Sequence, residues 1–219
     1  MLHLSKVKKL DGIFSWSLVA RETCPGAINA DGQLVDACAG CYAAYGNYRF
    51  PNVINPRIEN REDWQRVEWV DDMVSAMDNY RYFRWFDSGD CYSLSLAYKI
   101  LEVMKRTPWV KHWIPTRMMK FEKFQNVLNE MDSLPNVKVR FSSDSIMGEF
   151  EPGLHGSTII PTEDTMVEGV EICHAYKEEN AGKCNGCRKC WDKEIPVIGY
   201  IAHGRVAKKN VRIQLKLVK

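Results

Sequence analysis

Three charged residues recur in this chain at intervals of 27 residues, and each follows an apolar stretch. These residues are Asp90, Arg117 and Asp144. The stretches over residues 80–86, 110–114 and 137–141 have the composition of β-strands, and helical patterns separate them over residues 93–106 and 121–131. Strands that alternate with helices predict βα units and an α/β fold, with a parallel sheet curved into a partial or full barrel.

The remaining elements are predicted from apolar patterns outside these units. The expected strands cover residues 12–20, 157–160 and 196–202, and an expected helix lies within residues 58–79. Apolar and basic residues alternate near the end of the chain, which predicts a strand with a basic outer face over residues 205–219. We expect a barrel-like domain over residues 1–160 and a cysteine-rich, metal-binding extension over residues 161–219 that ends in this basic tail.

The loops that follow the strands of a parallel barrel meet at one end and form the active face. Asp90, Arg117 and Asp144 all lie in such loops, so we expect them to converge on one mouth as candidate catalytic residues. Ordinary turn and capping roles are the alternative for each residue alone. Charges that recur at the same place in each unit favour a shared site.

The chain has eight cysteines among 219 residues, and its N-terminus lacks the apolar stretch of a secretory signal. Disulfides suit small secreted chains with little core, whereas 45% of this chain is hydrophobic. The cysteines therefore favour metal ligation or catalysis. The formal charge of +2 gives no whole-chain electrostatic argument for binding nucleic acid or membranes. The sequence contains no run of about 18 apolar residues, so we expect no transmembrane helix. We expect a cytoplasmic protein.

Four cysteines gather toward the C-terminus, namely Cys173, Cys184, Cys187 and Cys190. The C-x2-C-x2-C spacing of the last three is a common way to hold three corners of a [4Fe–4S] cube. Zinc also accepts four thiolates, usually from two separated C-x2-C pairs. The pattern predicts a closed metal site and favours an iron–sulfur cluster, with zinc as the alternative.

Three further cysteines, Cys24, Cys38 and Cys41, follow the first predicted strand. A metal with three protein ligands keeps one position open for water, substrate or cofactor. Cys91 follows the next predicted strand, and it is either a fourth ligand that closes this site or a buried thiol. The two cysteine groups, one of three and one of four, predict two metal centres. The centre with three cysteines would be open at the mouth.

The tail from residue 199 onward has six Lys or Arg residues and no Asp or Glu. Its basic face is either a solvated edge protected by lysines or a contact for nucleic acid or a host protein. A non-catalytic binding module stabilised by iron–sulfur clusters or zinc is therefore the alternative to an enzyme.

The cysteine arrangement resembles that of radical S-adenosylmethionine enzymes, in which three cysteines hold a [4Fe–4S] cluster after the first strand of a parallel barrel. Cys38 and Cys41 have the last spacing of that superfamily's C-x3-C-x2-C motif, whereas 13 residues separate Cys24 from Cys38. The resemblance implies that the free iron chelates S-adenosylmethionine and that one electron cleaves it. It also implies that the four-cysteine group holds an auxiliary cluster.

Further cofactor contacts are implied by the same resemblance. Ser88, Gly89 and Asp90 are the counterpart of the acidic loop that holds the methionine amino group, and Tyr42 is an aromatic residue beside the last cysteine of the motif. An enzyme of this kind needs the small-molecule cofactor and an electron donor, and it needs no membrane.

The sequence more closely resembles a family of small phage proteins known as gene product eighty-eight. The matching stretches are Thr23 to Ala27, Cys38 to Ala43, Ser88 to Ser93 and Cys184 to Cys187. They are spread over about residues 14–192, which is most of the chain. The resemblance implies a phage-encoded protein that acts in the cytoplasm of a bacterial host.

Overall fold

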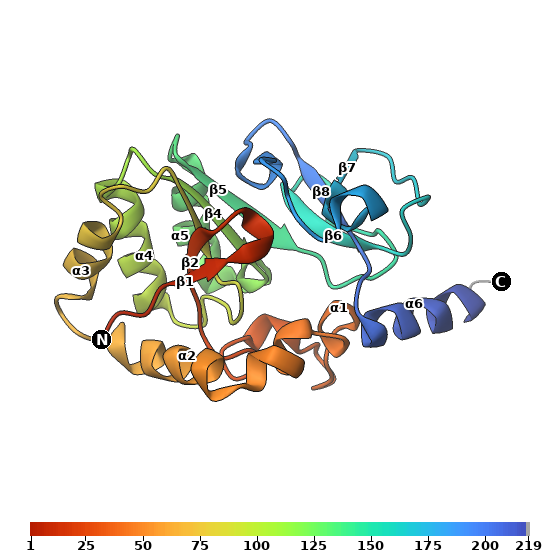
Figure 1. Ribbon diagram of the computed structural model, residues 1–219, viewed down its shortest axis with the longest axis horizontal. Helices are drawn as coiled ribbons and strands as arrows, with labels where there is room; N and C mark the ends of the chain where they lie inside the picture. Colours follow the sequence, from red (N-terminus) through yellow and green to blue (C-terminus); the bar gives the residue numbers. More distant parts are fainter. Residues whose placement is uncertain (218–219) are drawn as a thin grey trace.

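The computed structural model describes residues 1–217, and its strands form one mostly parallel sheet (Figure 1). The strands are β1 (Ser5–Val7), β2 (Ile13–Trp16), β3 (Tyr82–Trp85), β4 (Lys111–Thr116), β5 (Val137–Ser142), β6 (Gly156–Ile160), β7 (Val170–Ile172) and β8 (Val197–Ile201). Their order is β1-β2-β3-β4-β5-β6-β8-β7. β1 is antiparallel to β2, and the other described pairs are parallel. The expected α/β class and parallel sheet are confirmed, and the described sheet has β1 and β7 as its edges.

Helices cover the first half of this sheet and extend along one side of the molecule. They are α1 (Asp36–Ala39), α2 (Pro51–Asp63), α3 (Trp69–Ala76), α4 (Leu94–Arg106), α5 (Glu122–Ser133) and α6 (Arg205–Leu217). Figure 1 shows α3, α4 and α5 beside β1 to β5, whereas α2, α1 and α6 follow one another along the lower edge. In residues 1–217, no helix is both long enough and apolar enough to cross a membrane.

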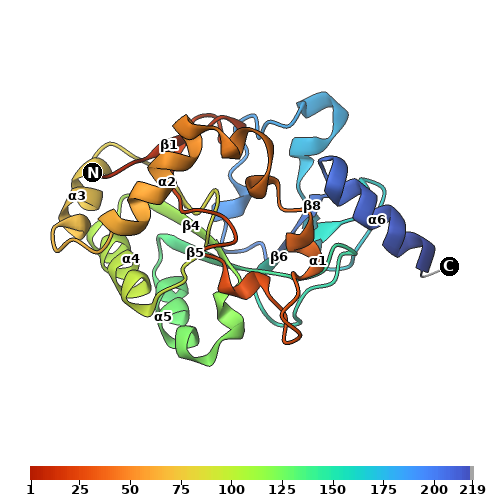
Figure 2. The ribbon, with the colours of Figure 1, turned by 90° about the horizontal axis from the view of Figure 1, so that it is seen from below.

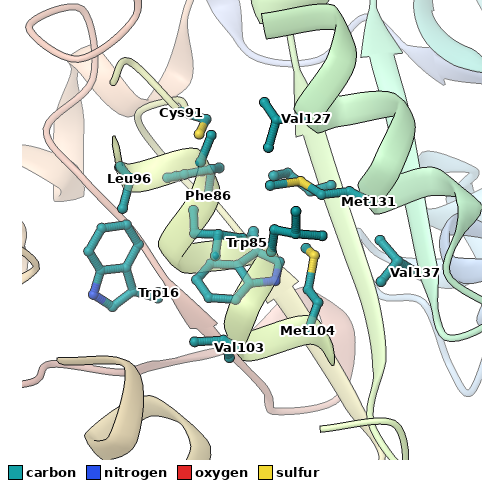
Figure 3. Packing of buried hydrophobic residues seen from close by; sticks show 14 of the residues in the cluster. Trp16, Trp85, Phe86, Cys91, Leu96, Val103, Met104, Val127, Met131 and Val137 are labelled. Carbon is teal, nitrogen blue, oxygen red and sulfur yellow. The ribbon is translucent and has the colours of Figure 1, made fainter. Parts of the chain in front are cut away.

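The main hydrophobic core lies between the first strands and helices α3 to α5. Trp16 and Trp85 from the strands pack with Leu96 of α4 and with Val127 and Met131 of α5, and each is no more than 1% exposed (Figure 3). Full burial of one such side chain contributes about 1.5–3 kcal/mol. This core fixes the strands whose following loops carry Asp90, Arg117 and Asp144.

A second core lies under the C-terminal cysteines. Leu10, Trp113, Trp191 and Ile198 are at most 5% exposed and pack together with Cys184 and Cys190. Both parts of the predicted division at residue 160 therefore contribute strands to one sheet, and the division into two domains stays a prediction.

The helix expected within residues 58–79 is wrong in its extent, because two helices occupy this region. α2 ends at Asp63, and the chain turns before α3 begins at Trp69. Arg66 donates to Asp63 at 2.7 Å within this turn. Val67 contributes to the helical spacing in the sequence, but it is 87% exposed and belongs to no buried face. The apolar pattern continues across a break that it cannot detect.

The strand expected over residues 205–219 is also wrong, because residues 205–217 form helix α6. Val218 and Lys219 lie outside the described residues. Lys, Arg, Gln and Leu are good helix formers, and the buried Val211 lies on the helix face that meets α1. A run of alternating residues shorter than three helical turns fits both the strand period of two and the helix period of 3.6 residues. Tertiary contacts therefore decide whether it forms a strand or a helix.

Candidate functional site

One long loop after β2 carries the first cysteine group, which consists of Cys24, Cys38 and Cys41. Within it, Ile28 and Leu34 form an antiparallel bridge, so the chain turns back on itself. The returning strand leads into α1, which contains Cys38, and the Cys41 N–H donates to the Cys38 carbonyl at 3.1 Å. The hairpin therefore returns the second and third cysteines toward the first despite the gap of 13 residues.

The three thiols lie within electrostatic reach of one another and of the predicted mouth residues. Burial, followed by the charge of Asp90, raises the pKa of Cys24 to about 12, and Cys38 and Cys41 act in the same direction. Burial also raises the pKa of Cys38, and the nearby Arg117 opposes this shift. The loop thus brings the first cysteine group to the place where Asp90 and Arg117 meet.

Asp90 connects the loops that follow β3 and β4. One carboxylate oxygen accepts hydrogen bonds from the Thr116 hydroxyl at 2.6 Å and the Cys91 N–H at 2.7 Å. The other oxygen accepts from the Arg117 N–H at 2.9 Å. The residue is only 6% exposed. Both oxygens are engaged within the protein, so Asp90 holds the mouth together and is not a free carboxylate.

Arg117 and Asp144 meet as the sequence predicts, and a lysine joins them. The Arg117 Nε lies 3.3 Å from one oxygen of Asp144, and the Lys120 ammonium donates to the other at 2.7 Å. Lys120 also donates to the Gly26 carbonyl at 2.9 Å. A Cβ atom on Gly26 would lie 2.6 Å from the Arg117 Cβ. These contacts hold the first cysteine loop against the loops after β4 and β5.

Ser88 and Gly89, predicted to contact a cofactor, also make close contacts within the protein. The Ser88 hydroxyl donates to the Leu18 carbonyl at 2.7 Å and accepts from Arg57 at 2.6 Å. Gly89 has a φ of +78°, and a Cβ atom there would lie 2.6 Å from the Leu18 Cβ and 2.7 Å from the Thr23 hydroxyl. The loop after β3 therefore needs glycine at this place to approach the segment that leads to Cys24.

Tyr42 belongs to a polar network that the sequence reasoning did not identify. Its hydroxyl donates to the Asp87 carbonyl at 2.8 Å, and the Tyr48 hydroxyl donates to the Asp87 carboxylate. Arg84 donates to that carboxylate at 2.8 Å, and Arg57 lies 3.7 Å from it. The sequence contains one signal for this network, which is Arg84 between two aromatic residues of β3. A cation that a strand buries needs a partner of opposite charge.

The second cysteine group, Cys173, Cys184, Cys187 and Cys190, lines one small cavity together with apolar side chains. Burial raises the pKa of Cys184 to about 11, and the other three cysteines act in the same direction. The structure therefore brings these four cysteines to one place, and their role as metal ligands stays a prediction. Trp191, next to Cys190 in the sequence, also lines this cavity and belongs to the second core.

Arg140 holds the loop that carries Cys190. Its guanidinium is fully buried and donates to the carbonyls of Cys190 at 2.9 Å, Lys189 at 3.0 Å, Asp192 at 2.9 Å and Ile195 at 3.0 Å. Two more carbonyls of neighbouring segments complete its set of acceptors. A single side chain of β5 thus fixes the backbone on which the second cysteine group depends, and the sequence gives no signal for this role.

Cys91 lies apart from both groups, on the helix side of the sheet. It is 0% exposed and belongs to the main core with Phe86 and Leu96 (Figure 3). Its sulfur lies 4.0 Å from the Ser93 carbonyl. Burial, with a smaller contribution from Asp90, raises the pKa of this thiol well above its usual value. These surroundings are those of a buried thiol, which is one of the two roles considered for this residue.

The donor chemistry of both groups fits a thiolate-ligated metal. Four thiols around one cavity suit a closed iron–sulfur or zinc centre, and three thiols at the mouth suit a centre with one open position. Within residues 1–217, no three side chains of Cys, His, Asp or Glu already stand in the geometry of a metal site. The sulfurs of each group would therefore have to draw together around a bound metal.

Comparison with known proteins identifies the family of this chain. No curated protein and no solved structure matches the chain. A family model described as gene product 88 matches residues 3–193, a range that includes every cysteine and the mouth formed by the loops after β2 to β5. The chain therefore belongs to the gene product 88 family.

Proposed function

We propose that the protein is an iron–sulfur protein similar in chemistry to radical S-adenosylmethionine enzymes. In this proposal, Cys24, Cys38 and Cys41 hold an open [4Fe–4S] cluster, the C-terminal cysteines hold a closed auxiliary cluster, and the sheet acts as a partial barrel. The observation that carries the proposal is the position of the loop after β2, which holds the three thiols. A Cβ atom on Gly26 of this loop would lie 2.6 Å from the Arg117 Cβ, and the Ala37 N–H donates to the Asp144 carbonyl at 2.9 Å. The four-thiol cavity beside the second core supports the auxiliary site.

Asp144, Arg117, Lys120 and Asp90 have different roles at the proposed mouth. Once reduced by an external electron donor, a cluster at the open site would supply an iron position for S-adenosylmethionine and the electron for its cleavage. Asp144 has a 44% exposed side chain, whereas Asp90 is 6% exposed, so Asp144 is the mouth carboxylate that can reach a bound molecule. Arg117 and Lys120 flank it and are suited to orient a carboxylate of the cofactor. Asp90 keeps the backbone of Arg117 in place.

The test is cleavage of S-adenosylmethionine by anaerobically prepared, reduced protein. We expect 5′-deoxyadenosine and methionine to form with the unaltered chain and to disappear in a Cys38→Ser variant, because three cysteines are the minimum that holds the open cluster. Products are measured by liquid chromatography with mass detection.

The matched control is Cys91→Ser, the same substitution in the main core. This variant should retain the cleavage, since Cys91 packs with Phe86 and Leu96 and does not ligate the cluster in this account. An unaltered, iron-loaded chain that forms no 5′-deoxyadenosine would contradict the proposal. A folded Cys91→Ser variant that loses its iron would show that Cys91 closes the site.

A further inference from the structure

Helix α6 carries a stripe of exposed cations. Relative to the first of these cations, the others lie three, four, seven and eleven positions further along, which puts them on one helix face. They are Arg205, Lys208, Lys209, Arg212 and Lys216. No Asp or Glu follows Glu194 in the sequence, so α6 supplies no carboxylate to neutralise this stripe.

The opposite face of α6 packs on the loop that carries the first cysteine group. Val211 is 3% exposed, and a Cβ atom on Gly40 would lie 3.1 Å from the Ala207 backbone nitrogen. The Gln214 amide donates to Asp36 of α1 at 3.1 Å. Figures 1 and 2 both show α1 beside α6. The cation stripe therefore has a fixed position next to the mouth.

The segment after Cys41 carries exposed aromatic rings, and one of them, Tyr42, lies next to the residues that precede the same helix. Tyr42 and Tyr45 are each 46% exposed and Phe50 is 56% exposed, all in the segment after Cys41. The Tyr42 ring centroid is 6.2 Å from that of His203, which stands two residues before α6 begins. Rings that remain this exposed add little to a core and leave apolar surface that a ligand could cover. The Arg21 guanidinium lies 5.3 Å from the Tyr45 ring centroid and adds a further cation beside the rings.

We propose that this face, composed of the α6 cations and the exposed rings after Cys41, binds single-stranded nucleic acid. Phosphates would pair with the cations, and unstacked bases would lie on the rings, since every base offers a π face. An acidic peptide would use the cations and leave the rings unused, and a duplex keeps its bases stacked on each other. This binding goes beyond the proposed metal chemistry and does not depend on it.

The test is fluorescence anisotropy of the full chain with a labelled oligothymidine of about 20 nucleotides. With five phosphate contacts, the slope of log affinity against log salt should be about −3.5. The triple variant Lys208→Ala/Lys209→Ala/Arg212→Ala should bind at least ~10-fold more weakly, with a slope of about −1.4. The double variant Tyr45→Leu/Phe50→Leu should also lose about 10-fold or more in affinity, with an unchanged slope.

The matched control is Arg81→Ala/Lys111→Ala/Lys123→Ala, which removes three exposed cations from elsewhere on the surface and lowers the net charge equally. It should bind with the affinity and salt slope of the unaltered chain. The proposal would be overturned by an equal loss in both triple variants or by equally tight binding of a duplex of the same length. Equally strong competition by poly-L-glutamate would also overturn it, because the surface would then be one for acidic proteins.

Discussion

An Arg140→Met variant is expected to lose about 3–5 kcal/mol of the free energy of unfolding. The Arg140 guanidinium is 0% exposed and donates to six backbone carbonyls, four of them in the segment from Lys189 to Ile195. Methionine fills much of the same volume but leaves these carbonyls without a donor inside the protein. Thermal and urea unfolding measure the loss. The loop should also release Cys190, which alkylation under native conditions detects.

The matched control for this substitution is Arg106→Met. Arg106 pairs with Asp71 at 2.8 Å on the surface, where such a pair contributes about 0–1 kcal/mol. A small loss at both positions would contradict the role of Arg140. If Arg140→Met fails to fold, Arg140→Lys keeps the charge but has too few donors for these carbonyls, and it should show the same order of effects with a smaller magnitude.

A Gly89→Ala variant should lose about 3 kcal/mol of stability and disturb the first cysteine group. The left-handed φ of +78° strains any residue with a Cβ atom, and this Cβ atom would also lie 2.6 Å from the Leu18 Cβ. Relief requires the segment from Leu18 to Cys24 to move, because the backbone carbonyl carbon of Leu18 is also close, at 3.0 Å. The free energy of unfolding and the metal content per chain are the two measurements.

The control variant Gly32→Ala measures the stability loss from backbone strain alone, without the close contacts that surround Gly89. Gly32 has nearly the same φ, +77°, but no atom lies within 4 Å of a Cβ atom built on it. Its substitution should therefore cost only about 1 kcal/mol and leave the metal content unchanged. Equal costs at Gly32 and Gly89 would show that the close packing of the loops after β2 and β3 contributes nothing.

Much of the sheet and its long helices was predictable, because their apolar periods coincide with tertiary contacts. The helix expected over residues 93–106 is α4, and it ends before Pro108, as the residue before a proline disfavours helix. The strands expected over residues 110–114 and 137–141 are β4 and β5. Their spacing also places Arg117 next to Asp144, as the structure has it.

What could not be predicted depends on contacts between segments far apart in the sequence. The basic tail alternates like a strand, but packing against α1 makes it a helix. The return of Cys38 and Cys41 toward Cys24 depends on a hairpin of irregular structure, which has no repeating apolar pattern in the sequence. The hydrogen bonds of Arg140 join residues about 50 positions apart, so no local sequence pattern predicts them.

The most direct measurement is the iron and acid-labile sulfide content of the anaerobically purified chain, together with its zinc content. Two [4Fe–4S] clusters predict about eight iron and eight sulfide per chain, and Cys38→Ser/Cys41→Ser and Cys184→Ser/Cys187→Ser should each reduce these values to about four. A colourless protein that contains zinc and no iron, or no metal at all, would contradict the account.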